Sequence, residues 1–239
     1  MPQPFQRVLL KVSGEAIRSN SPHDTVDEAV VDRIAAEIAA AHHDLGTHFA
    51  LVLGGGNIWR GAVGVAAGMN QTDADNMGML ATVINALAFK DALRRHGYEP
   101  RVMSGLEIHR VCEPWIAERG RRHLEKGRVV ICAAGIGEPD FTTDTAAVQR
   151  AIELEIPVLF KGTHNVDGVY SADPHQHPDA KLYDKLSYAE ALERRLGVMD
   201  ATAFTKAEKR QLPIRIFNIA VAGNIRRAAA GEAIGTYMS

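Results

Sequence analysis

Short apolar runs along the chain alternate with longer stretches in which apolar residues recur every three or four positions. The short runs have the length of strands that are buried on both faces, and the longer stretches have the period of an α-helix. This alternation predicts an α/β fold in which helices cover both faces of a mostly parallel sheet. The expected strands, which fit one sheet, are Arg7–Val12, Phe49–Leu53, Arg101–Met103, Arg128–Cys132, Pro157–Phe160 and Ile214–Phe217.

Helices are expected between these strands. The first, Asp27–Leu45, ends at Gly46, a typical C-cap, and a long helix over Asp75–His96 is closed by Gly97. The buried side chains expected in the long helix include Met79, Val83, Leu87 and Leu93. Further helices that begin at capping residues are expected over Thr143–Leu154, Ser187–Leu196 and Asp200–Lys209.

The length of 239 residues fits one large domain, or two closely joined lobes that share a sheet. The most irregular segment is Asp167–Pro178, which is rich in Gly, Asp, Pro and His, and only one clear strand follows it. We therefore expect a single domain over residues 1–239, with approximate lobes 1–160 and 161–239, and not two independent domains.

Composition and charge exclude several classes of protein. Hydrophobic residues make up 46% of the chain and charged residues 23%, which is typical of a globular protein with a sizeable core. A net charge of -2 gives no reason to expect a nucleic-acid or membrane partner, so any phosphate binding must be local. The two cysteines, Cys112 and Cys132, are too few for a disulfide framework and no Cys/His cluster has zinc spacing, so we expect no protein-only metal site. Without a signal peptide or a membrane-spanning stretch, a cytoplasmic protein is expected.

Two of the predicted strands end in residues suited to binding phosphate. In parallel sheets, ligands bind beyond the carboxyl ends of the strands. Lys11 is the last residue but one of the first strand and Gly14 comes just after that strand, and three consecutive glycines, Gly54–Gly56, follow the second strand and precede Arg60. Glycines let backbone N–H groups approach phosphate oxygens, and arginine adds charged hydrogen bonds. The alternatives are an ordinary surface lysine and a tight turn that needs positive φ.

Two later segments carry further candidates. Thr142 and Thr143 precede a predicted helix, where hydroxyl groups can cap the backbone, bind phosphate or do both, and Asp144 could orient a lysine or hold magnesium indirectly. In the loop that follows the fifth strand, Tyr170 could stack on a base and Asp173 could accept a hydrogen bond from an adenine amine or a ribose hydroxyl. Such loops are also ordinary turns in many proteins. The P-loop, the protein-kinase catalytic loop and the G-x-S-x-G elbow are absent from the sequence.

Taken together, several segments resemble the bacterial UMP kinases of the amino-acid kinase superfamily, in an order and spacing that agree from Arg7 to about Gly235. The resemblance implies a three-layer sandwich with a mostly parallel central sheet (the amino-acid kinase fold), ATP and Mg²⁺ as cofactors, UMP as the acceptor and a homohexamer. The segments are Lys11–Glu15 (KVSGE), Gly54–Gly61 (GGGNIWRG), Gly68–Leu80 (GMNQTDADNMGML), Phe141–Asp144 (FTTD) and Val166–Pro174 (VDGVYSADP).

The resemblance also implies roles for individual residues. The catalytic residues it implies are Lys11, Arg60, Asp144 and Asp200, with the two aspartates organising the lysine and the magnesium ion. The implied UMP-binding residues are Gly55, Asp75, Ile136, Gly137, Glu138, Pro139, Asp140, Phe141, Thr142 and Thr143, with Asp75 on the ribose. The implied ATP-binding residues are Lys11, Val12, Ser13, Gly14, Gly56, Arg60, His164, Tyr170 and Asp173.

The chain departs from the family pattern in its predicted UMP-binding loop. The family more often has Gly-Thr-Gly-Asn-Pro-Phe-Phe, whereas this chain has Ile136, Glu138 and Asp140 at the variable positions. Extra carboxylates repel a substrate phosphate unless they point away or pair with a cation. Two other functions therefore stay open: a different small-molecule kinase of the superfamily, and a nucleotide-binding storage or regulatory protein that has lost phosphoryl transfer.

Overall fold

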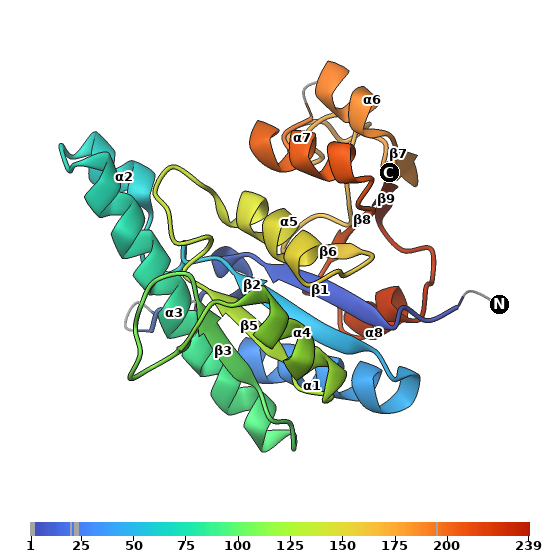
Figure 1. The fold of residues 1–239 in the computed structure, drawn as a ribbon. Coiled ribbons are helices and arrows are strands. Elements are labelled where there is room, and N and C mark those ends of the chain that lie inside the picture. The colour runs from blue at the N-terminus through green and yellow to red at the C-terminus, as the bar shows by residue number, and fades with distance from the viewer. Residues whose placement is uncertain (1–2, 20, 22–23, 195) are drawn as a thin grey trace.

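One continuous sheet runs through the protein. The structure is a computed structural model that describes residues 3–19, 21, 24–194 and 196–239. Within these residues a nine-stranded sheet has the order β4-β3-β5-β2-β1-β6-β8-β9-β7, and its neighbouring strands are parallel except for β8 and β9 (Figure 1). The strands are β1 (Arg7–Val12), β2 (His48–Leu53), β3 (Arg101–Ser104), β4 (Glu113–Pro114), β5 (Val130–Ala133), β6 (Leu159–Thr163), β7 (Lys185–Leu186), β8 (Ile214–Asn218) and β9 (Thr236–Met238).

The helices begin and end at residues with the expected local chemistry. Asp27 caps the first helix by accepting a hydrogen bond from the Val30 amide at 3.1 Å, and Gly46 ends it with φ 70°. The helices are α1 (Glu28–Leu45), α2 (Gly61–Ala66), α3 (Gln71–Arg95), α4 (Ala117–Glu125), α5 (Thr143–Glu153), α6 (Tyr188–Glu193), α7 (Ala201–Arg210) and α8 (Asn224–Ala229), with a 3₁₀ turn at Gly14–Ile17. No helix in the described part of the chain is both long and apolar enough to cross a membrane.

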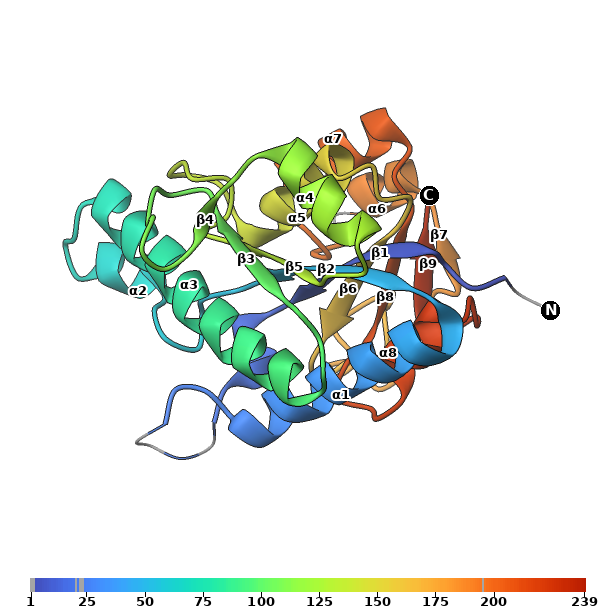
Figure 2. The same ribbon diagram turned by 60° about the horizontal axis from the view of Figure 1, so that its bottom comes forward.

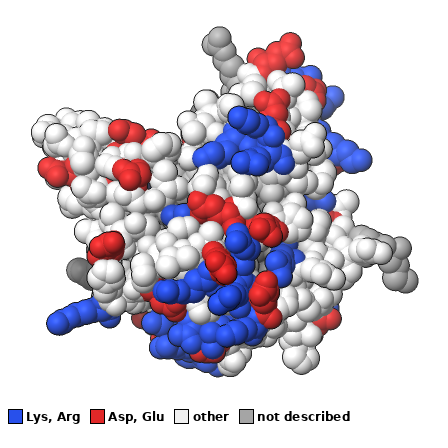
Figure 3. All heavy atoms as spheres, in the orientation of Figure 1, with Lys and Arg blue, Asp and Glu red and all other residues white. Residues whose placement is uncertain are grey.

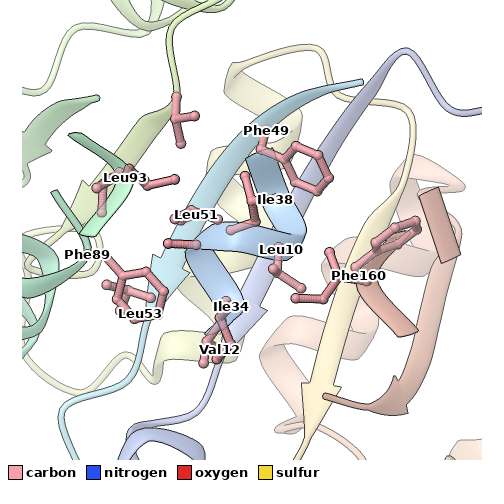
Figure 4. Packing of buried hydrophobic residues seen from close by; sticks show 14 of the residues in the cluster. Leu10, Val12, Ile34, Ile38, Phe49, Leu51, Leu53, Phe89, Leu93 and Phe160 are labelled. Carbon is pink, nitrogen blue, oxygen red and sulfur yellow. The ribbon is translucent and has the colours of Figure 1, made fainter. Parts of the chain in front are cut away.

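Successive side chains of the central strands point to opposite faces of the sheet, and a hydrophobic core lies on each face. In β1, Leu10 and Val12 pack with α1, α3 and α8, whereas Leu9 packs with α4, α5 and α7 on the opposite face. Figure 2 shows the helices on both sides of the sheet, and Figure 4 shows side chains of α1 and α3 against β1, β2 and β6. Each fully buried Leu or Phe side chain contributes about 1.5–3 kcal/mol. The predicted three-layer α/β fold is confirmed.

The sequence-based elements differ from the structure in identifiable ways. All six predicted strands exist, but the expectation of only one strand in the C-terminal part is wrong, because β7 and β9 join β8 there. Helix α3 begins four residues earlier than predicted, because Asn70 accepts hydrogen bonds from the Thr72 and Asp73 amides. Leu87 is 37% exposed and not buried, since it lies on the face of α3 that turns away from the core. The sheet continues past residue 160, and the division into lobes stays a prediction.

Candidate functional site

The loops after β1 and β2 pack backbone against backbone. A Cβ atom on Gly14 would lie 2.6 Å from the Gly56 nitrogen, and one on Gly54 would lie 2.6 Å from the Gly14 nitrogen. None of Gly54–Gly56 has φ in the left-handed range, so close approach and not turn geometry requires glycine at position 54. A Cβ atom on Gly56, by contrast, would meet no atom within 4 Å. The alternative of a tight turn at positive φ is therefore wrong for these three glycines.

A pair of buried amides holds the glycine loop against α3. Asn85 is fully buried, and its Nδ2 donates to the Gly54 carbonyl at 2.7 Å and to Asn57 Oδ1 at 2.8 Å. Asn57 Nδ2 donates in return to Asn85 Oδ1 at 3.1 Å. Because a buried polar group that loses its partner costs about 1–3 kcal/mol, this pair favours a single position of the loop.

A cavity of about 460 Å³, which we call the glycine-loop cavity, opens beyond β1 and β2. Its walls also include the N-terminal part of α3 and the segment before α5. In the space-filling view the surface is hollowed between the part that carries α2 and α3 and the part that carries α6 and α7 (Figure 3). The predicted site residues that line the cavity are Lys11, Ser13, Gly14, Gly55, Gly56, Arg60, Asp75, Glu138, Phe141, Thr142 and Thr143.

Asp144, in the first turn of α5, lies between two lysines. Its Oδ1 is 2.9 Å from Lys11 Nζ and its Oδ2 accepts a hydrogen bond from Lys161 Nζ at 2.5 Å. Burial alone would raise the pKa of Asp144, but the two ammonium groups outweigh this and hold the pKa below its ordinary value. The side chains of all three residues are at most 15% exposed. The sequence-based interpretation that Asp144 orients a lysine is supported by this geometry, although the second lysine is absent from the prediction.

Asp200 is close to this cluster but has other partners. It caps α7 through the Ala203 amide at 2.9 Å, and it accepts hydrogen bonds from the hydroxyl groups of Thr142 and Thr145. Thr142 is itself the N-cap of α5, so its hydroxyl both caps a helix and lines the glycine-loop cavity. No described contact joins Asp200 to Lys11, and the organising role of Asp200 stays a prediction.

Two charged residues at the cavity wall already have partners. Arg60 Nη2 lies 2.5 Å from Glu15 Oε1, and the two side chains are 50% and 58% exposed. Asp75 accepts hydrogen bonds from Gln71 Nε2 at 3.0 Å and from the Asp140 amide at 2.9 Å. Asp140 makes this second contact with φ 66°, an uncommon backbone conformation for a residue other than glycine. A ligand that uses Arg60 or Asp75 must therefore share or replace these contacts.

A second cavity, of about 590 Å³, lies between the end of β6 with the loop that follows it and the segment after α6. Tyr170, Asp173 and Lys161 line it together with Arg194. We call it the tyrosine cavity. The structure does not bring every predicted residue to a cavity wall: Val12 packs in the core, and neither cavity is lined by Ile136, Gly137, Pro139, Asp140, Asp144, Asp200 or His164.

Two site residues could have been found from the sequence. Lys161 follows the apolar run Val158–Phe160, as Lys11 follows Val8–Leu10, and a lysine within a buried strand is uncommon. Arg150 is buried on α5, donates to the Gly135 carbonyl at 2.8 Å and lies 4.0 Å above the Trp115 ring. It therefore fixes the start of the loop that carries Glu138. In the sequence, Arg150 stands out because it falls on the face of the predicted helix that is mostly apolar.

Among the described residues, no group of three or more His, Cys, Asp or Glu side chains is placed to hold a metal ion. The two carboxylates that the resemblance assigns to magnesium already have partners: Asp144 forms ion pairs with two lysines, and Asp200 accepts hydrogen bonds. This donor set fits a magnesium ion that is held mainly by substrate phosphates, which is the usual mode of Mg²⁺ binding.

Glycine-lined loops and a lysine–aspartate–lysine cluster at the carboxyl edge of a parallel sheet define an α/β protein built to bind phosphorylated ligands. The chain belongs to the amino acid kinase family, whose sequence model matches residues 6–218. A UMP kinase from Bacillus anthracis is similar over 99% of this chain and 97% of its own, with 37% identity and a TM-score of 0.94. A UMP kinase from Ureaplasma parvum has 34% identity and a TM-score of 0.92, with both chains covered completely. A uridylate kinase from Archaeoglobus fulgidus has 25% identity and a TM-score of 0.72, with 97% and 99% covered.

Proposed function

We propose that this chain is a UMP kinase that transfers the γ-phosphoryl group of ATP to UMP, giving UDP and ADP in pyrimidine nucleotide biosynthesis. The observation that carries the proposal is the cluster of Lys11, Asp144 and Lys161. One of its lysines lines the glycine-loop cavity and the other lines the tyrosine cavity, so a single carboxylate links two binding spaces. Two nucleotides bound with their phosphates toward this cluster would meet there. The similarity to UMP kinases over the whole chain supports the choice of acceptor.

In this proposal UMP occupies the glycine-loop cavity. Its phosphate faces Lys11, Arg60 and the amides around Gly56, and its ribose faces Asp75. ATP occupies the tyrosine cavity, where Tyr170 offers a ring for stacking and Asp173 a hydrogen-bond acceptor. The resemblance assigns five residues of the glycine-loop cavity to ATP, so this proposal places them where the phosphates of the two nucleotides meet: Lys11, Ser13, Gly14, Gly56 and Arg60. His164 and Val12 remain proposed ATP contacts that line neither cavity.

Phosphoryl transfer requires two like-charged phosphates to be held in line while the charge on the transferred oxygens is neutralised. Lys11 and Arg60 supply positive charge, and Asp144 fixes the position of the Lys11 ammonium group. The attacking UMP phosphate is already ionised, so Asp144 and Asp200 need not act as bases. Magnesium, when bound to the donor phosphates, supplies further charge neutralisation.

Replacing Asp75 with asparagine is expected to raise the KM for UMP by about 10–100-fold and to change the KM for ATP little. The reason is that a hydrogen bond to a charged group contributes about 1.5–3 kcal/mol, and Asp75 lines only the cavity assigned to UMP. Steady-state kinetics with each substrate varied in turn measure both constants. Asp73→Asn, a change on an exposed residue of the same helix, is the matched control. Equal effects of Asp75→Asn on both substrates would contradict the assignment.

A coupled assay of ADP release with UMP, CMP and amino-acid acceptors tests the function itself. Release with UMP supports the proposal. Release only with an amino acid indicates another small-molecule kinase of the family. Nucleotide binding without release from any acceptor indicates a storage or regulatory protein, which the carboxylate of Glu138 in the glycine-loop cavity keeps as the second candidate.

Self-association as a homohexamer is also part of the proposal, together with a cytoplasmic location. Helix α3 exposes large apolar side chains at helical spacing, Met77, Leu80, Ile84 and Leu87, each between 37% and 53% exposed. An exposed apolar stripe of this kind is typical of an interface. We expect Ile84→Glu to lower the mass measured by light scattering or sedimentation, whereas Val221→Glu, at a separate exposed position, leaves the mass unchanged. A wild-type monomer at micromolar concentration would contradict self-association.

A further inference from the structure

We propose that Lys161 is a second catalytic lysine, which contacts the donor phosphates from the tyrosine cavity while Lys11 contacts the acceptor side. This inference rests on the proposed function and assigns a role to a residue that the motif comparison leaves without one. Three features carry it: the placement of Lys161 in the sheet, the charge balance of its surroundings and the cavity that it lines.

The sheet places the two lysines side by side. Strands β1 and β6 are parallel neighbours, and Lys11 and Lys161 are paired in register. Residues paired in this way point to the same face of the sheet, which here is the face covered by α5. The first turn of α5 brings Asp144 over both ammonium groups, at 2.9 Å from Lys11 Nζ and 2.5 Å from Lys161 Nζ. The geometry of the cluster is thus set by strand register and by one helix start.

The charges in this cluster do not balance. One carboxylate faces two ammonium groups, and the side chains of Lys161 and Asp144 are only 14% and 15% exposed. The negative charge of Asp200 attracts the Lys161 ammonium group from further away, but the Asp200 oxygens accept their hydrogen bonds from Thr145 and the Ala203 amide. Burial and the nearby Lys11 lower the pKa of Lys161, and Asp144 opposes them. A buried charge without a full counter-charge is costly, and an anionic phosphate would supply the missing negative charge.

Lys161 has access to only one of the two cavities. It lines the tyrosine cavity with Tyr170 and Asp173, whereas Lys11 lines the glycine-loop cavity. In the transfer step, the bond from the γ-phosphorus to the oxygen that bridges it to the β-phosphate breaks, and a bond from the γ-phosphorus to a UMP phosphate oxygen forms. Lys161 stays an ammonium group throughout, donates hydrogen bonds to the donor phosphates and gives up no proton. Its contribution is the stabilisation of charge that develops on the leaving ADP.

A purely structural role for Lys161 makes a different prediction. If Lys161 only held Asp144 in place, glutamine could replace it, because the glutamine amide can still donate a hydrogen bond to a carboxylate. If instead the lysine charge contacts phosphate, replacement by glutamine or by methionine lowers kcat, because neither side chain carries a positive charge. Arginine, which keeps the charge with a different shape, then restores part of the activity.

The test uses Lys161→Gln, Lys161→Met and Lys161→Arg in the full chain, with Lys126→Met, at the exposed residue that caps the C-terminus of α4, as the control. We expect the Gln and Met variants to lose about 10²–10³-fold in kcat with UMP and ATP, the KM for UMP to change less than threefold, and the Arg variant to fall in between. Calorimetry should show ADP binding weakened about tenfold or more and adenosine binding unchanged, because only ADP carries the phosphates.

Two results would overturn the inference. One is a Gln variant with kcat within threefold of the wild type. The other is an equal loss of affinity for ADP and adenosine in the Gln variant, which would show that the change disturbs the cavity and not a phosphate contact. The ratio of the affinities for ADP and adenosine can be measured at low temperature, even if a variant unfolds at a lower temperature than the wild type. A wild-type chain that transfers phosphate to no acceptor would overturn the proposed function, and the ADP-to-adenosine comparison would still decide whether Lys161 contacts phosphate.

Discussion

Replacing Lys11 with methionine is expected to lower kcat with ATP and UMP on the order of 10³-fold while the fold stays intact. Lys11 lines the cavity assigned to the acceptor, and its ammonium group lies within 2.9 Å of the carboxylate that orients it. Removing a preorganised charge next to the transferred phosphoryl group costs 10²–10³-fold or more in comparable sites. The fold should survive, because methionine fills a similar volume and Asp144 keeps its contact with Lys161.

Steady-state kinetics and a thermal melt together check this expectation. Lys126→Met serves as the control, since it removes a lysine of the same size from an exposed position. A Lys11→Met variant that melts like the wild type and retains more than a tenth of its turnover would remove Lys11 from the catalytic machinery.

Replacing Asp144 with asparagine is expected to lower both stability and activity. The change leaves two buried ammonium groups side by side without a counter-charge, and breaking a buried ion pair in this way costs about 3–5 kcal/mol. Chemical denaturation measures the loss. Asp91→Asn is the matched control, because Asp91 pairs with Arg95 on the surface and such pairs contribute about 0.3–0.5 kcal/mol.

The pH dependence gives this prediction a second check. The pKa of Asp144 is lower in the folded state than its ordinary value, so its stabilising contribution is present above the ordinary carboxyl pKa and is lost as the pH falls through the folded-state value. The difference in unfolding free energy between the wild type and Asp144→Asn should therefore shrink in acid. A difference that stays constant from neutral pH down to the acid limit would contradict the paired, ionised state of Asp144.

The elements that could be predicted from the sequence are those with long patterns. Strand β1 was predicted to the residue because it is a continuous apolar run, and α1 was predicted within one residue because Asp27 and Gly46 mark its ends. Strand β4 is two residues long and contains Pro114, and β9 has three residues, so neither is long enough to form a pattern. Helix α4 was not predicted because only Gly120, His123 and Leu124 of its nine residues are buried.

Residues of the candidate site could likewise be predicted only where they belong to a recognisable sequence motif. Lys11, Asp75 and the pair Gly55 and Arg60 come from three separate motifs, and the fold brings them to one cavity. Lys161 belongs to no motif, since its proximity to Asp144 depends on the pairing of β1 with β6 across the sheet. Pairing between strands far apart in the sequence is a tertiary property that local patterns do not encode. The roles of Ile136, Glu138 and Asp140 stay predictions.

The position of β1 in the sheet has a consequence for synthesis on the ribosome. It is the earliest strand in the described chain, yet it lies in the interior of the sheet, with Leu9–Val12 paired to Ala50–Leu53 on one edge and to Leu159–Gly162 on the other. A nascent chain that has not reached β6 therefore presents the second edge of an apolar strand with unpaired backbone groups, which favours aggregation. We therefore expect the N-terminal part of the sheet to be most prone to aggregation before the strand that carries Lys161 has been made.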